Sequence, residues 1–443
     1  MDIITFLLCK CCRREGENRK NFSKYVSQNI LGMIGFSCYV LADSYFISIA
    51  KGADGLTALN LVMPLYSIIF SIGEMIGVGS AIRYAISKIK KDADADDYFW
   101  NALIWCILSS MLFVFAGIFF SADIMRVLGA DEHIVAVGNN YTKIFMCFAP
   151  MFMCNYVTNA FVRNDGAPGI AMSATLFSSL FNIVFDYILM FPMNLGMEGA
   201  ALATALSPII GMGICSIHFF SKKSSVRLVV CKPSVRKLVA GSQLGVSAFV
   251  GEMSSAVITL AFNFVILKLA GNVGVAAYGV VANIAIVTTA VFNGVAQGSQ
   301  PLISSCFGRG DKDGCTQLKR MGYTTAFVLA AVMYSILFIF AGQFVAVFNS
   351  EGSEMLRLYA TEGVKLYFIG IFFAGINIVS GGAFSATEDA FKAAVVSVAR
   401  GFVLILGAVF VMSALFGMTG VWLAYAVAEG ITTFIMLVMV LRV

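Results

Sequence analysis

The sequence predicts an all-α integral membrane protein in which twelve transmembrane helices form two pseudo-symmetric six-helix bundles. Three observations favour this fold class. Hydrophobic residues make up 59% of the 443 residues and charged residues only 12%, about half of the charge of a soluble chain. The apolar residues gather in runs long enough to cross a bilayer, and segments of the first half recur in the second.

Twelve runs reach the roughly 20 apolar residues that a membrane-spanning helix needs. In chain order they lie at about 27–50, 56–86, 100–121, 136–162, 167–191, 198–220, 238–269, 275–306, 321–344, 360–385, 392–416 and 419–442. Because twelve is even, both termini should face the same compartment.

The repeat relates the first six runs to the last six. Residues 195–206 read LGMEGAALATAL and residues 416–427 read FGMTGVWLAYAV, which match at six of twelve positions with an offset of 221. Gly79-Ser80 recurs as Gly298-Ser299 at an offset of 219. Since six helices return the chain to its starting side, the two bundles should be related by an axis along the membrane normal, as in transporters with parallel repeats.

The distribution of Lys and Arg predicts the topology. The expected terminus side carries 22 of them and the other side six, which places both termini in the cytoplasm of a multi-pass protein of the plasma (inner) membrane. We divide the chain into a cytoplasmic basic tail (1–24), an N-terminal six-helix bundle (25–221), a cytoplasmic linker (222–237) and a C-terminal six-helix bundle (238–443). The cluster Cys9, Cys11 and Cys12 in the tail is open to lipidation, metal binding or no special role.

Charged side chains inside the predicted helices are the first functional candidates, because each costs about 2.5–3.5 kcal/mol at the centre of a bilayer. They are Asp43, Glu74, Arg83, Asp186, Glu252, Arg400 and Glu429, with His218 expected at a membrane interface. For Arg400 and Glu429, which lie at similar depth, we favour a structural ion pair.

Five oxygen-bearing side chains of the N-terminal bundle share one depth in its outer half. Asp43 and Asp186 approach the outer ends of their helices, Asn182 lies one turn from Asp186, and Thr204 and Tyr141 follow the start of inward-running helices. Such hard oxygen donors suit H⁺ or a small alkali cation. We expect a cation-coupling site, with Na⁺ possible at Asp43, Asn182, Asp186 and Thr204. The alternative is a buried hydrogen-bond network that only stabilises the bundle.

The repeat shows that this acidic cluster is not duplicated, since Asp43 aligns with Phe262 and Thr204 with Tyr425. Conversely, Glu252 belongs to the second half alone and either binds a cationic substrate or a second proton, or is a structural acid. Tyr39 and Asn159 are candidates for lining a substrate cavity, with core packing as the alternative.

Enzyme motifs are absent. The sequence has no P-loop, no H-x-x-x-H zinc motif and only two histidines. We therefore expect a non-enzyme without cofactor that uses an ion gradient of H⁺ or Na⁺.

The chain resembles the multidrug and toxic compound extrusion (MATE) family over almost its whole length. The resemblance rests on the tandem halves, the segments 77–80, 163–166 and 300–303, the pair Asn182-x-x-x-Asp186, and residues 196–204. It implies ion-driven efflux, with coupling residues at Asp43, Tyr141, Asn182, Asp186 and Thr204 and a substrate cavity near Tyr39 and Asn159. The chain departs from the family in lacking a proline early in helices 1 and 7, and helix 10 offers only Asn377 where another branch has an acid.

We interpret the chain as an antiporter that expels amphipathic, cationic compounds, acting as a monomer in the lipid bilayer without a nucleic-acid partner. A related flippase for lipid-linked saccharides is the nearest alternative, but it would need a strongly basic cavity. An intramembrane acyltransferase would need a midplane histidine or nucleophile dyad, and a channel would not exchange ions for substrate.

Overall fold

The computed structural model describes residues 3–227, 229–348 and 353–441, with side chains from Gly16 onward except that of Ala53. The described residues are helical or lie in turns and loops, and no strand occurs among them. The helices are α1 Ile3–Lys90, α2 Asp97–Val127, α3 Glu132–Cys147, α4 Ala149–Asn164, α5 Pro168–Met190, α6 Gly196–Phe219, α7 Val235–Gly308, α8 Lys312–Ile339, α9 Ala341–Phe348, α10 Glu354–Tyr367, the 3₁₀ turn Phe368–Gly370, α11 Ile371–Ala386, α12 Ala390–Val398, the π-helical turn Ala399–Val403 and α13 Leu404–Leu441.

Twelve membrane spans emerge from these helices. Within the described ranges, nine helical segments are long and apolar enough to cross a membrane, and the bent pair α3 and α4 makes a tenth. Two of the nine hold two spans each, because the backbone leaves helical geometry at Gly271 in the 74-residue α7 and at Gly417 in the 52-residue segment 390–441. The predicted fold class is therefore confirmed.

One predicted helix differs in shape. The run 136–162 forms α3 and α4, which meet at 46° around Phe148. Pro150 is the second residue of α4, where its missing N–H costs nothing because the first turn has no intrahelical acceptors for these groups. The break thus has an identifiable cause in the sequence.

The backbone repeats the symmetry of the sequence. Gly52 in α1 (φ 59°, ψ −142°) and Gly271 in α7 (φ 61°, ψ −157°) both interrupt a helix, and they stand at the offset of 219. Gly196 and Gly417 also have positive φ, 51° and 58°, and stand at the offset of 221. Four turns at one end of the molecule are thus built in equivalent pairs.

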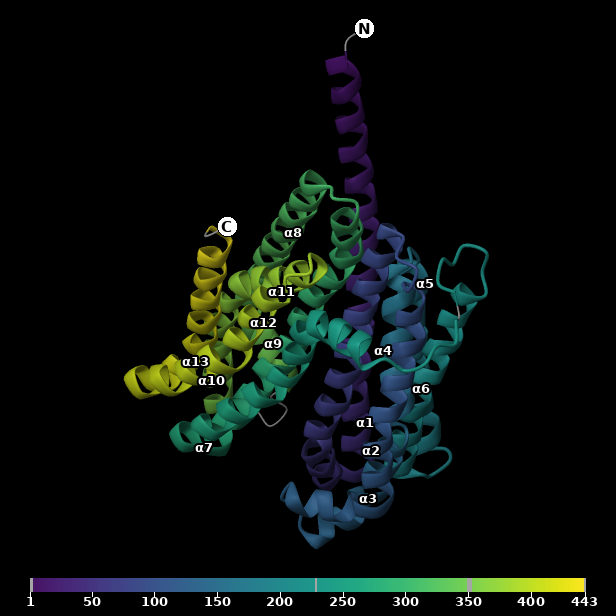
Figure 1. The fold of residues 1–443 in the computed structure, drawn as a ribbon. Helices are drawn as coiled ribbons and strands as arrows, with labels where there is room; N and C mark the ends of the chain where they lie inside the picture. Colours follow the sequence, from purple (N-terminus) through teal and green to yellow (C-terminus); the bar gives the residue numbers. More distant parts are fainter. Residues whose placement is uncertain (1–2, 228, 349–352, 442–443) are drawn as a thin grey trace.

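Each half has its own hydrophobic core, and we call residues 16–219 the N-lobe and 235–441 the C-lobe. One cluster joins α1 after Ile47 to α2, α3, α4, α5 and α6, with Leu244 of α7 added to it, and the other joins α7 to α8, α9, α10, α11 and α13. Figure 1 shows the two lobes side by side, with the start of α1 and the end of α13 on the same side of the molecule. Phe22 and Val26, near the start of α1, pack into the core of the C-lobe.

The lobes meet tightly at the end where the termini lie. A β-carbon built on Gly79 would lie 2.1 Å from the carbonyl oxygen of Gly241, and one on Gly298 would lie 2.7 Å from Cα of Val26. Small residues at such positions let helix backbones approach closely. We call this contact the seam. From the seam the lobes diverge toward the opposite end of the molecule (Figure 1).

The segment between the lobes is fastened to the N-lobe. Asp165, at the end of α4, accepts hydrogen bonds from His218 Nε2 (2.8 Å) and from the backbone N–H of Ser225 (2.9 Å). The hydroxyls of Tyr84, Ser224 and Ser225 also donate to it. His218 is 3% exposed and shares the Asp165 carboxylate with Ser224 and Ser225, so it is buried within the protein. Its depth at a membrane interface stays a prediction. The side chains of Cys9, Cys11 and Cys12 lie outside the described residues.

Candidate functional site

The structure brings the five predicted coupling residues together inside the N-lobe. Asp43 comes from α1, Tyr141 from α3, Asn182 and Asp186 from α5, and Thr204 from α6, and none of them is more than 6% exposed. The carboxylates of Asp43 and Asp186 interact electrostatically with each other and with the hydroxyl of Tyr141. We call this group the acidic pocket.

Hydrogen bonds inside the acidic pocket are incomplete. With the Asn182 amide oriented to satisfy both of its ends, its N–H donates to Asp186 Oδ2 (3.2 Å) and its oxygen accepts from the Thr204 hydroxyl (3.2 Å). Oδ1 of Asp43 and Oδ1 of Asp186 are buried and have no hydrogen-bond partner. Since buried polar groups are nearly always paired, these two free acceptors could accept a proton or a small cation.

Tyr66 is a member of the pocket that the sequence did not single out. Its hydroxyl pairs with that of Tyr141, and its ring stacks on Phe145 with a centroid distance of 3.6 Å. An aromatic residue in an apolar run gives no signal of function by itself. Only the approach of its helix to α3 places this hydroxyl beside the acids.

A cavity lies between the lobes and adjoins the acidic pocket. All three residues predicted for it, Tyr39, Asn159 and Glu252, line it. Tyr39 also interacts electrostatically with Asp43, one helical turn further along α1, so it stands between the cavity and the acidic pocket. Asn159 is held by its amide, which donates to Thr175 Oγ1 and to the carbonyl of Ala171, both at 3.2 Å.

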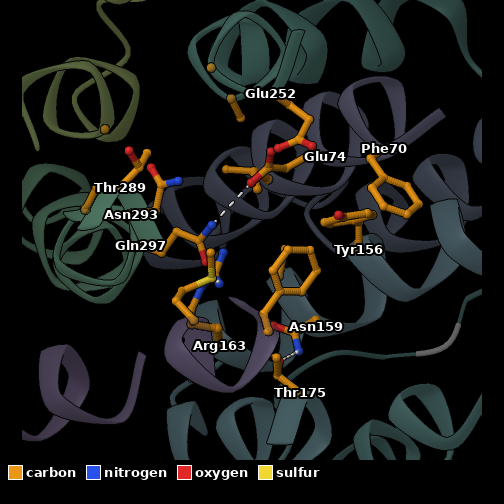
Figure 2. Close-up of a pocket in the computed structure, with 18 of the residues that line it drawn as sticks. Phe70, Glu74, Tyr156, Asn159, Arg163, Thr175, Glu252, Thr289, Asn293 and Gln297 are labelled. Atoms are coloured by element: carbon orange, nitrogen blue, oxygen red, sulfur yellow. Dashed lines mark hydrogen bonds between the residues drawn. The ribbon is translucent and has the colours of Figure 1, made fainter. Parts of the chain in front are cut away.

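The cavity also carries a polar row that crosses from lobe to lobe. Gln297 of the C-lobe donates from Nε2 to Glu74 Oε1 (3.2 Å) and accepts at Oε1 from Arg163 Nη1 (2.6 Å). Glu74 and Arg163 both belong to the N-lobe. Figure 2 shows Gln297 between them, with Glu252 beside Glu74 and the rings of Phe70 and Tyr156 to one side.

Arg400 and Glu429 form the ion pair that the sequence favoured. Arg400 Nη2 lies 2.7 Å from Glu429 Oε1, and Asn377 donates to Glu429 Oε2 at 2.7 Å. Arg400 sits in the π-helical turn, which adds one residue to the helix and redirects the side chain. Asn377 therefore serves this pair, and Glu252 has no ion-pair partner in the described part of the chain.

A multidentate metal site would need several His, Cys, Asp or Glu side chains close together. No group of three or more such side chains comes together within the described residues. The acidic pocket holds two carboxylates, and its other donors are amide and hydroxyl oxygens. Such a set suits a weakly held monovalent ion better than a divalent metal.

Comparisons with known proteins agree with this architecture. The family model described as MatE matches residues 29–188 and 248–411. The chain is 27% identical over 414 residues to the multidrug export protein MepA of Staphylococcus aureus (strain MRSA252), covering 91% of this chain and 89% of that protein. It is 26% identical over 409 residues to the MepA protein of Staphylococcus saprophyticus, with the same two coverages.

Solved structures share the fold. One is described as the outward-facing conformation of a multidrug resistance MATE family transporter of the MOP superfamily; it has a TM-score of 0.89, 20% identity and 96% coverage of both chains. Another is a MOP superfamily transporter from Pyrococcus furiosus whose description reports a binding pocket of reverse polarity, with a TM-score of 0.88, 20% identity and 95% coverage of both chains.

Proposed function

The chain belongs to the MatE family, and on that premise we propose that it exports amphipathic, cationic compounds in exchange for H⁺ or Na⁺. The resemblance noted in the sequence is confirmed, as is the prediction that the chain is not an enzyme, since its named relatives are export proteins and transporters. The direction of transport, the substrates and the coupling ion belong to the proposal.

One observation carries the proposal: two buried aspartates of one lobe each keep an oxygen without a partner. Two carboxylates held close together in a medium of low dielectric repel each other strongly. A proton or Na⁺ bound between them relieves that repulsion, and Asn182 and Thr204 supply further oxygens. Occupation of the pocket then depends on the cation outside, which is what a coupling site requires.

The route from ion to substrate runs through Tyr39. A cation bound to Asp43 removes a negative charge from the far side of this tyrosine, while substrate lies on its cavity side. The negative charge of Asp43 thus attracts either the coupling ion or the cationic substrate, and the two compete although they do not touch each other. Tyr39 packs edge to face on Phe36, with ring centroids 5.1 Å apart, so a shift of α1 would move the cavity wall as well.

The charge of the cavity favours an organic cation over a lipid-linked pyrophosphate. Glu74 and Glu252 line it together with Arg163 and Arg400, and Glu429 neutralises Arg400. A slightly acidic cavity repels a pyrophosphate and attracts a cation. We therefore do not adopt the flippase alternative.

The test is uptake of a fluorescent organic cation into everted membrane vesicles, with pH and sodium gradients imposed separately. We expect uptake under one of the two gradients, and Asp43→Asn and Asp186→Asn should each reduce it at least tenfold with unchanged amounts of protein in the membrane. Asp123→Asn is the matched control, because Asp123 is an exposed acid of the same lobe. Full uptake by both pocket variants would refute the coupling role.

A further inference from the structure

A groove on the C-lobe lies between the first span of α7 and the start of α13. Its apolar walls come from Val257, Leu260, Phe264 and Leu267 of α7 and from Leu406 and Phe410 of α13. The four residues of α7 recur every three or four positions, so they form one helical stripe. Glu252, Gly251 and Ser247, which line the cavity between the lobes, lie about half a turn away on the same helix. The groove therefore faces away from the cavity, toward the lipid.

The equivalent helices of the N-lobe, α1 and α5, are packed together by aromatic rings. Phe46 of α1 contacts Tyr187 and Phe191 of α5, with ring centroids 6.3 and 6.2 Å apart. At the repeat offset of 219, Val265 takes the place of Phe46. The C-lobe has no ring at that position, and Phe264 beside it is 54% exposed in the groove. The open groove is thus a feature of the side chains of one lobe and does not follow from the shared fold.

A positive charge lies at the end of the groove that is farthest from the termini. The ammonium of Lys268 is 4.0 Å from the centre of the Phe264 ring, which holds it at the groove wall. Gly271, three residues later, separates two membrane spans, so Lys268 lies at the depth of the lipid head groups. Lys268 forms no salt bridge with any described residue. Its repeat equivalent in the N-lobe is the apolar Ile49.

Two side-chain amides of the groove, those of Asn263 and Asn272, have no hydrogen-bond partner among the described residues. Asn263 lies five residues before Lys268, or about 7 Å deeper along the helix. An amide at that depth is unfavourable in hydrocarbon unless an acceptor reaches it. Its repeat equivalent, Ser44, satisfies its own hydroxyl by donating to the carbonyl of Val40 (3.2 Å). Asn263 therefore calls for an acceptor from outside the protein.

We propose that this groove binds one anionic diacyl phospholipid, a phosphatidylglycerol, from the leaflet opposite the termini. Its phosphate lies at Lys268, an ester carbonyl accepts from Asn263, and an acyl chain runs along Leu260 and Phe410. A charge at head-group depth, a donor below it and an apolar wall below the donor follow the order of the parts of such a lipid. Phosphatidylcholine matches the wall and the donor equally well, but it brings a second cation to Lys268. This inference concerns a site outside the cavity and does not rest on the proposed export function.

The test identifies the lipid that lies against residue 264. Bromine on an acyl chain quenches the fluorescence of a neighbouring tryptophan, so Phe264→Trp reports the lipid in the groove. The full-length protein is reconstituted in mixtures of dioleoyl phosphatidylglycerol and dioleoyl phosphatidylcholine, with one or the other dibrominated. Tyr45→Trp is the matched control, because Tyr45 is the repeat equivalent of Phe264 in the N-lobe and is 62% exposed. The unmodified protein supplies the signal of the three native tryptophans, which is subtracted from both.

We expect phosphatidylglycerol to be enriched at least threefold over phosphatidylcholine at Phe264→Trp, since a lysine near the surface attracts anionic lipid. At Tyr45→Trp the two lipids should quench within a factor of two of each other. Addition of Lys268→Gln should remove the enrichment at residue 264 and leave the control position unchanged. This substitution keeps a side chain of similar length and removes only the charge.

Three outcomes would overturn the proposal. Equal enrichment at both positions would show a general preference of the protein for anionic lipid. Enrichment that survives Lys268→Gln would show that this lysine does not select the lipid. Quenching at residue 264 that is weak with both lipids, but strong at residue 45, would show that something other than lipid fills the groove. If Phe264→Trp does not fold, Leu260→Trp on the same wall, 63% exposed, takes its place.

Discussion

Gly52 and Gly271 take the same unusual backbone conformation 219 residues apart, one in each lobe. Both combine φ near +60° with a strongly negative ψ, a region that only glycine populates readily. Each glycine separates two membrane spans. It is the one residue with non-helical dihedral angles inside its helix, α1 or α7. The duplicated fold is therefore visible in single dihedral angles as well as in sequence.

Replacing either glycine should expose this conformational role. Nothing lies within 4 Å of a β-carbon at Gly52 or Gly271, so alanine meets no clash and the cost is the backbone conformation alone. We expect Gly52→Ala and Gly271→Ala each to destabilise the protein by about 1–3 kcal/mol. Thermal unfolding in detergent measures this, and Gly213→Ala, in a helix with equally open space, should be neutral or slightly stabilising.

The seam should fail if a side chain is added. A β-carbon on Gly79 would overlap the backbone of Gly241, which cannot yield as a side chain can. We expect Gly79→Leu to hold the lobes apart at this end. Across the seam, Arg83 of the N-lobe pairs with Glu388 of the C-lobe, so these two positions report the distance between the lobes.

The measurement is cross-linking of Arg83→Cys with Glu388→Cys by a short bifunctional thiol reagent, with the 11 native cysteines replaced by Ser. Gly79→Leu should slow the reaction at least tenfold. Gly213→Leu serves as the control. Equal cross-linking in both would show that the seam tolerates the added bulk.

The contribution of a salt bridge across the seam can be tested by exchanging its two charged residues. Arg83 of the N-lobe pairs with Glu388 of the C-lobe, and Lys90 lies 3.5 Å from the same carboxylate. Arg83→Glu should destabilise the protein by about 1 kcal/mol or more, because it sets two acids against each other. Combination with Glu388→Arg should recover most of the loss. Thermal unfolding of the four proteins of this cycle gives the coupling energy; additive losses would show that the pair contributes nothing.

Asp165 should control how firmly the linker is held. It receives bonds from His218 and from Ser224 and Ser225 of the linker, and breaking a buried pair by removing one partner costs about 3–5 kcal/mol. We expect Asp165→Ala to release the linker and to raise trypsin cleavage at Lys223 and Arg227 at least tenfold. Asp313→Ala, on an exposed acid near the start of α8, should leave cleavage unchanged.

The grouping of the acidic pocket was predictable because it depends on few quantities. A membrane span has a nearly fixed length, and its direction follows from the order of spans, so the depth of a residue can be read from its distance to a helix end. Asp43, Asp186 and Thr204 were placed together in this way. Their roles remain predictions, since geometry alone brings them together.

Contacts between lobes could not be predicted in the same way. The row Glu74, Gln297 and Arg163 joins residues up to 223 positions apart, and no helical period relates helices of different lobes. His218 shows the same limit from the other direction. Its place near a helix end predicted its depth, but not its contact with Asp165, whose carboxylate also holds the linker.

Phe22 and Val26 make the first helix part of the hydrophobic cores of both lobes. Downstream, from Ile47 onward, that helix belongs to one hydrophobic core; upstream, these two side chains complete the other. The lobes consequently cannot part at the terminus end as two independent rigid bodies. If the lobes move apart, the start of α1 either moves with the C-lobe, so that the helix bends between its two hydrophobic cores, or Phe22 and Val26 become exposed. In the first case, motion of the lobes is transmitted along α1 past Tyr39 and Asp43.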